Sequence, residues 1–214
     1  MIQLETMKNT YRILLLILIG LLLPISISAK DYFKVLDNMN GLPDNTVNCI
    51  RQDARGFIWM GTASGLCRYD GLSFNTFKHD PSDAFSLIND NVHKMLPTTG
   101  GLWVATDGGM QFYSFADGCF HLCNATDGPK TYPMKMRIIS MVSSGGNVFV
   151  TDESGNLYIN RGGRTDGWFN VVKHKFNVYA VCGYQKSMLL AASDKGLYLL
   201  SSDGRRMISK CPCN

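Results

Sequence analysis

Residues 47–71 read VNCIRQDARGFIWMGTASGLCRYDG, in which short apolar runs alternate with turn signals. Asp53-x-x-Gly56 is one such signal, because an Asp side chain caps a turn and Gly adopts the positive φ that the turn needs. Asp70-Gly71 is a second signal, typical of a tight hairpin. The pattern predicts four short strands joined by turns, over residues 47–52, 57–62, 66–69 and 74–77.

This unit is repeated along the chain. Trp59 and Trp103 lie 44 residues apart, in the same apolar run of two successive copies. Each of four copies carries a glycine, at Gly65, Gly109, Gly155 and Gly196, so the steps are 44, 46 and 41 residues. A period in the forties with four antiparallel strands per unit is typical of a propeller blade. We therefore predict an all-β fold: a partial β-propeller of about four blades, each four-stranded and antiparallel, preceded by a signal peptide.

The repeat also predicts how the chain is divided. We expect a signal peptide at 1–29, a leader strand and the loop after it at 30–46, and blades at 47–89, 90–133, 134–172 and 173–214. The last two blades are degenerate copies, and the last one includes the C-terminal end. Polar stretches at 79–89 and 124–132 are expected to connect successive blades.

The N-terminus has the pattern of a secretory signal. Lys8 and Arg12 precede an apolar run at 13–27, and small residues follow it. The run is short for a membrane span, which needs about 20 residues. We expect an exported protein, with an uncleaved N-terminal anchor as the alternative.

Composition and charge argue against a disordered chain, a nucleic-acid-binding protein and a cysteine-based metal site. Hydrophobic residues make up 45% and charged residues 18% of the chain, which is typical of a folded domain. The net charge of +4 is not clustered apart from Arg205-Arg206, so we expect no binding of nucleic acid. All seven cysteines follow the signal, and their odd number leaves at least one thiol unpaired. Their spacing fixes no pairing and predicts no metal site.

The first repeat resembles a known family. Ile50-x-x-Asp53-x-x-Gly56-Phe57-Ile58-Trp59-Met60-Gly61-Thr62, continued by Gly65-Leu66 and Arg68-Tyr69-Asp70-Gly71, is similar to the two-component regulator propeller repeat. Gly41-Leu42-Pro43 resembles the segment that precedes it in such sensors. The resemblance covers roughly residues 32–200 and is weakest in the last two copies.

The resemblance implies a function. Such repeats build the periplasmic sensor of hybrid two-component systems in Bacteroides-type bacteria, ahead of a membrane helix and a histidine kinase, and many members sense glycan breakdown products. It therefore implies a truncated, periplasmic, ligand-sensing part of a two-component sensor that acts by binding. We expect no enzyme activity and no cofactor in this chain, since it shows no helical histidine-bearing segment and no nucleotide-binding glycine motif.

The expected partners follow from the same resemblance. They are an oligosaccharide ligand and either further propeller blades or a second copy of the chain, with the membrane reached only through a downstream region or an uncleaved signal. A stand-alone exported binding or scaffold propeller is the alternative. A glycan-acting hydrolase or lyase is the third hypothesis, and the four histidines form no recognisable catalytic or metal pattern.

The loop just before each repeat glycine is the predicted ligand-binding face, because this loop varies while the scaffold around it is repeated. It contains Ser64, Asp107, Glu153 and Lys195. Trp59 and Trp103 are expected to pack between blades rather than to stack on sugars. Asp53 is expected to form a turn rather than to act as a general base.

Overall fold

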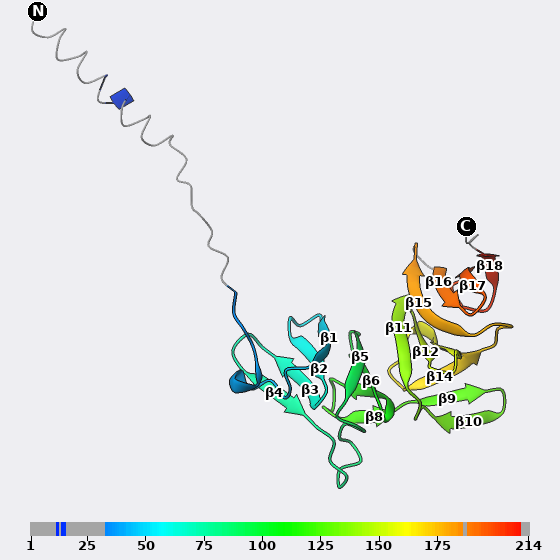
Figure 1. Ribbon diagram of the computed structural model, residues 1–214, viewed down its shortest axis with the longest axis horizontal. Helices are drawn as coiled ribbons and strands as arrows, with labels where there is room; N and C mark the ends of the chain where they lie inside the picture. Colours follow the sequence, from blue (N-terminus) through cyan, green and yellow to red (C-terminus); the bar gives the residue numbers. More distant parts are fainter. Residues whose placement is uncertain (1–11, 13, 16–32, 186–187, 211–214) are drawn as a thin grey trace, which may run out of the picture. The chain divides into compact units, whose positions relative to one another are not determined.

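The computed structural model describes residues 12, 14–15, 33–185 and 188–210 (Figure 1). The chain divides into two units, residues 1–35 and residues 36–214. Most of the predicted signal peptide, 1–29, lies outside the described residues. Within those that are described, no helix has the length and apolar character of a membrane span.

The described part of residues 36–214 folds almost entirely as β-structure, in four sheets that each contain four consecutive antiparallel strands. The first sheet contains β1 (Val47–Gln52), β2 (Ile58–Thr62), β3 (Gly65–Tyr69) and β4 (Phe74–Phe77). The second contains β5 (Val92–Pro97), β6 (Gly101–Thr106), β7 (Gly109–Ser114) and β8 (Phe120–Leu122). The third contains β11 (Ile138–Ser144), β12 (Asn147–Asp152), β13 (Leu157–Asn160) and β14 (Trp168–Val172). The fourth contains β15 (Val178–Tyr184), β16 (Met188–Ser193), β17 (Gly196–Leu200) and β18 (Met207–Lys210). The predicted fold, a partial propeller of four-stranded blades, is confirmed.

The third sheet has two strands more than expected. β9 (Asn124–Asp127) and β10 (Lys130–Pro133) form a hairpin, and β9 pairs in parallel with β14. The prediction of a polar connection at 124–132 is therefore wrong, and the hairpin joins the third sheet although it falls within the predicted range 90–133. Gly128-Pro129 supplies the hairpin turn, with Gly128 at a φ of +57°, and β-branched Thr126 and Thr131 pair across the two strands.

The leader strand predicted within 30–46 does not form in the part of the chain that is described. Residues 33–37 are assigned no strand, and a short 3-10 helix, η1 (Asn38–Asn40), follows them. The Asp37 side chain caps this helix by accepting hydrogen bonds from the backbone N–H groups of Met39 and Asn40. A second short 3-10 helix, η2 (Arg161–Gly163), follows β13.

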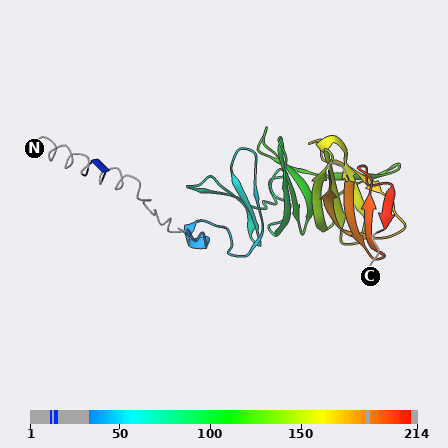
Figure 2. The same cartoon turned by 90° about the horizontal axis from the view of Figure 1, so that it is seen from above.

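Successive sheets pack through apolar side chains, and the views in Figures 1 and 2 show them following one another in chain order. Trp59 is fully buried between the first two sheets and Trp103 between the second and third, which confirms both as core residues. The first strands of neighbouring sheets are in contact: β1 with β5, β5 with β11, and β11 with β15. Among the described strands, those of the first and fourth sheets make no substantial contact.

All the cysteines that the structure describes are free thiols: Cys49, Cys67, Cys119, Cys123 and Cys182. Cys67 and Cys123 are buried, where burial raises the pKa of each thiol. Cys211 and Cys213 lie outside the described residues.

Candidate functional site

Each of the four first strands contains a β-bulge at the same place. The pairing of β1 with β2 skips one residue between Val47 and Cys49, and β5, β11 and β15 skip one residue in the same way. The skipped residues are Asn48, His93, Ile139 and Tyr179. Because a bulge leaves one residue outside the ladder and re-aims its side chain, bulges are frequent next to functional sites.

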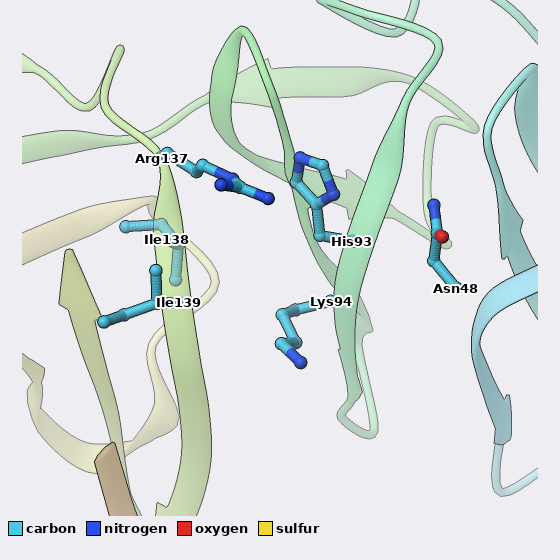
Figure 3. Close-up of a pocket in the computed structure, with 6 residues that line it drawn as sticks. All are labelled: Asn48, His93, Lys94, Arg137, Ile138 and Ile139. Atoms are coloured by element: carbon cyan, nitrogen blue, oxygen red, sulfur yellow. The ribbon is translucent and has the colours of Figure 1, made fainter. Parts of the chain in front are cut away.

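Three of these first strands line one pocket, which we call the bulge pocket (Figure 3). Its volume is about 340 Å³, within the range of small-molecule sites. Its lining is Asn48, His93, Lys94, Arg137, Ile138 and Ile139, so it draws on the first three sheets. The repeat thus brings equivalent positions of separate blades to one place.

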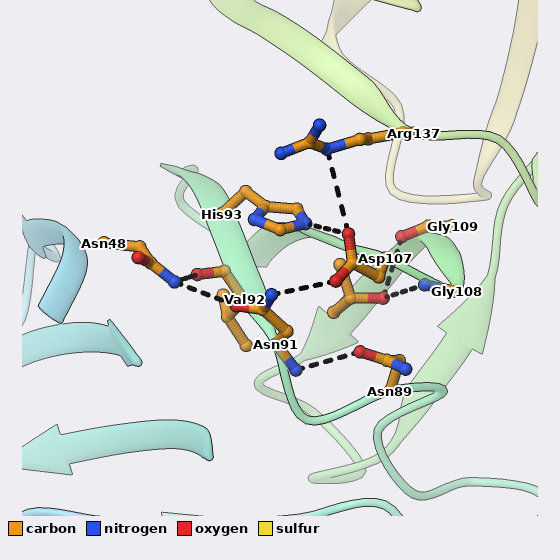
Figure 4. Close-up of polar contacts among 10 residues, drawn as sticks. Asn48, Asn89, Asn91, Val92, His93, Asp107, Gly108, Gly109 and Arg137 are labelled. Carbon is orange, nitrogen blue, oxygen red and sulfur yellow. Dashed lines mark hydrogen bonds and ion pairs between the residues drawn. The ribbon is translucent and has the colours of Figure 1, made fainter. Parts of the chain in front are cut away.

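Asp107, in the turn between β6 and β7, is the centre of the polar contacts beside this pocket (Figure 4). Its Oδ1 accepts a hydrogen bond from His93 Nε2 at 2.6 Å and lies 3.7 Å from Arg137 Nε. Its Oδ2 accepts a hydrogen bond from Asn91 Nδ2 at 2.8 Å. One carboxylate therefore holds three side chains from β5, the segment before β5, and the segment before β11.

Three further hydrogen bonds extend this network to the first and third sheets. Asn48 Nδ2, on the first sheet, donates to Asn91 Oδ1 and to the carbonyl oxygen of Val92, both at 3.0 Å. The carbonyl oxygen of Arg137 accepts a hydrogen bond from the backbone N–H of Glu153 at 3.1 Å, in the third sheet. A continuous chain of polar contacts therefore crosses the first three sheets.

The protonation of the network follows from its geometry. Burial raises the pKa of Asp107, but the hydrogen bonds from His93 and Asn91 and the charge of Arg137 outweigh burial and hold that pKa below its ordinary value. Asp107 is thus ionised at neutral pH and only accepts hydrogen bonds, so His93 Nε2 is the donor. This leaves Nδ1 as the ring atom that can contact a ligand. With the Lys94 and Arg137 cations, the site can bind hydroxyl or carboxylate groups.

The four loop residues predicted from the sequence lie in equivalent turns but not in one site. Asp107 is central to the network, and Glu153 touches it through its backbone. Ser64 Oγ instead donates to Asp44 Oδ2 at 2.8 Å, and Lys195 Nζ donates to the carbonyl oxygen of Lys175 at 2.7 Å.

Asn48, His93 and Arg137 line the bulge pocket but were not predicted from the sequence as ligand-binding residues. The available signal was that Asn48 and His93 are both second residues of a first strand, each directly after a valine. Arg137 has no such signal, because it lies in the variable segment between two blades.

Comparison with known proteins agrees with the fold. Residues 41–64 match the model of a protein family described as Two component regulator propeller. Histidine kinase P4 of Formosa agariphila is 35% identical over 68 residues, which are 30% of this chain and 5% of that protein. The family resemblance read from the first repeat is therefore confirmed.

Two solved structures from B. thetaiotaomicron share the fold. The extracellular domain of the putative hybrid two component system BT3049 superposes with a TM-score of 0.65 at 20% identity, over 84% of this chain and 26% of that one. The extracellular domain of the putative one component system BT4673 gives a TM-score of 0.63 at 16% identity, over 85% and 27%. The chain thus spans about a quarter of these structures and one-twentieth of the curated relative.

Proposed function

We propose that residues 36–210 belong to the ligand-sensing propeller of an exported, periplasmic two-component sensor, and that the bulge pocket receives the ligand. The observation that carries the proposal is that one pocket collects the equivalent bulged positions of three successive blades. The match of residues 41–64 to the two component regulator propeller supports the sensing role.

The mechanism is binding rather than chemistry. A ligand in the bulge pocket would contact Asn48, His93 and Arg137, which come from three separate blades. It would therefore stabilise one mutual arrangement of these blades. A ligand can signal only when it binds two arrangements of the sensor with different affinities. A ligand that contacts three blades loses contacts when those blades move relative to one another, so its affinity differs between the two arrangements.

A glycan-derived oligosaccharide is the ligand class that we propose. The pocket offers an amide at Asn48, an imidazole at His93 and cations at Lys94 and Arg137, all of which bond sugar hydroxyls or carboxylates. Half-buried Ile139 adds an apolar residue to this otherwise polar lining, and Ile138 lies buried beneath it.

Titration of the purified chain with oligosaccharides from partial hydrolysis of bacterial and plant polysaccharides tests this proposal. We expect at least one fraction to raise the melting temperature and to bind saturably by calorimetry, with no change in its chromatographic profile. His93→Ala should weaken that binding at least tenfold, a loss of about 1.4 kcal/mol.

His121→Ala is the matched control, because His121 Nε2 also donates to an aspartate, Asp117 Oδ2, at 2.9 Å, but lies on β8 away from the pocket. It should bind like the parent chain. Cleavage of an oligosaccharide would refute a mechanism of binding without chemistry, and equal affinities of the two variants would refute binding at this site. Reading the gene beyond codon 214 tests the sensor role itself, which requires a membrane span and a kinase in the same system.

A further inference from the structure

A second cavity lies between the segment that joins β14 to β15 and the two outer strands of the fourth sheet. Its volume is about 460 Å³, and it shares no lining residue with the bulge pocket. Five cations line it, and we call it the basic groove: Lys173, Lys175, Lys195, Arg205 and Lys210. Its lining includes no Asp or Glu.

Most of this positive charge is not neutralised by the protein. Lys173 Nζ forms an ion pair with Asp127 Oδ1 at 2.8 Å, and Lys195 Nζ donates to a backbone carbonyl. In the described part of the chain, no carboxylate forms an ion pair with Lys175, Arg205 or Lys210. Cations gathered in a concave surface raise the local concentration of anions.

The wall of the groove is a stack of three rings. The ring centroids of His174 and Phe176 are 4.8 Å apart, and those of Phe176 and Tyr198 are 4.3 Å apart with an angle of 5° between the planes. Lys210 Nζ lies 5.7 Å from the centroid of the Tyr198 ring. The stack gives the groove a partly apolar wall beside its cationic side chains.

One polar atom in this wall lacks a partner. His174 Nε2 is buried and has no hydrogen bond within the described residues. Burial lowers the pKa of His174, so the ring is neutral near pH 7 and retains one donor and one acceptor nitrogen. An unpaired buried polar atom is unusual in a native structure.

We propose that the basic groove binds a small organic polyanion, of about the size of a disaccharide and carrying two or more sulfate, phosphate or carboxylate groups. The groove is larger than one inorganic anion needs, and it combines several cations with an apolar wall. Lys and Arg side chains are the usual partners of such groups. The inference does not depend on the proposed function, because it uses other residues.

Calorimetric titration of the full chain with sucrose octasulfate tests the inference, with sucrose and inorganic sulfate as comparison ligands at equal ionic strength. We expect saturable 1:1 binding of the octasulfate, none of sucrose, and at least tenfold weaker binding of inorganic sulfate. The triple variant Lys175→Gln, Arg205→Gln, Lys210→Gln should weaken octasulfate binding at least tenfold.

The matched control is Arg51→Gln, Lys78→Gln, Lys135→Gln, which removes the same charge from exposed residues outside the groove and should change the affinity less than twofold. A charge-retaining variant, Arg205→Lys with Lys175→Arg, should bind nearly as well as the parent, which separates loss of charge from loss of fold. Equal weakening by the two triple variants, absence of saturable binding, or inorganic sulfate binding as tightly as the octasulfate would overturn the inference.

Discussion

The Asp53 side chain accepts hydrogen bonds both within its own turn and from Trp59, which packs between the first two sheets. The Asp53 side chain is fully buried, and it accepts hydrogen bonds from Trp59 Nε1 at 2.9 Å, Arg55 Nη2 at 2.8 Å and the backbone N–H of Phe57 at 3.1 Å. This geometry agrees with the turn-forming role expected for Asp53. The indole of Trp59 is held by the turn of its own repeat.

Asp53→Ala should lower the free energy of unfolding by about 3 kcal/mol, because it leaves the Trp59 indole N–H buried without a partner and loosens the turn. Urea denaturation followed by tryptophan fluorescence measures this. Asp70→Ala is the control, since Asp70 accepts comparable bonds from Leu72 and Ser73 in an exposed turn. A loss for Asp53→Ala no larger than that for Asp70→Ala would contradict the assignment.

The same carboxylate predicts a dependence of stability on pH. Burial raises the pKa of Asp53, but the hydrogen bonds from Trp59 and Arg55 outweigh burial and hold that pKa below its ordinary value. A lowered pKa in the folded state means that the stabilising contribution is complete above the unfolded pKa of about 3.9 and is lost as pH falls through the folded pKa. The difference in unfolding free energy between the parent and Asp53→Asn should thus be constant from about pH 7 to 5 and shrink toward about pH 3. A difference that grows on acidification would disprove this.

The two repeat tryptophans offer a matched pair of substitutions. Both are fully buried, but Trp59 Nε1 donates to Asp53, whereas Trp103 Nε1 has no hydrogen-bond partner among the described residues. Trp→Phe removes the same atoms at both positions. Trp59→Phe should therefore cost about 1–3 kcal/mol more in unfolding free energy than Trp103→Phe. Equal costs in parallel denaturation series would show that the Asp53 bond adds nothing beyond packing.

The start of strand β7 depends on the absence of a side chain at Gly109. Its φ is +130°, and a Cβ there would collide with the carbonyl oxygen of Met134 in the next blade. Gly56 also has a positive φ, of +92°, but a Cβ there meets nothing within 4 Å. A substitution at Gly56 therefore measures backbone strain alone, whereas the same substitution at Gly109 adds a steric collision.

Gly109→Ala should lower the free energy of unfolding by about 2–4 kcal/mol, while Gly56→Ala should cost only about 1 kcal/mol from strain. Thermal unfolding followed by circular dichroism compares the two. If both variants melt at the same temperature, the close approach of β7 to Met134 is not a constraint on the fold.

The strands of the first sheet were predictable because their residues carry local signals. The predicted bounds of β1 to β4 lie within one residue of the observed bounds. They follow from the alternation of apolar and polar residues over 47–52 and from the turns at Asp53-x-x-Gly56 and Asp70-Gly71. The bulges were not predictable, because one unpaired residue barely disturbs an alternating pattern. His93 and Asp107 meet only once β5 and β6 have paired, so their contact depends on strand register rather than on a local motif.

The described part of residues 36–214 is a series of sheets, each of which packs against the next. Each interface has its own apolar cluster, formed by side chains of the two sheets on either side. The polar network from Asn48 to Glu153 crosses two of these interfaces on the side of the first strands. A change in how successive blades pack would therefore alter the bulge pocket, and a ligand in this pocket would alter the packing.

Hydrogen–deuterium exchange of the full chain, with and without the oligosaccharide fraction that binds, tests whether one ligand site is shared by three blades. We predict slower exchange at residues 47–49, 92–94 and 137–140 together, since the bulge pocket is built from these three segments. Segments 173–176 and 205–210 should not change, because they belong to the basic groove. Protection confined to one blade, or protection elsewhere with the bulge pocket unchanged, would contradict a ligand site shared by three blades.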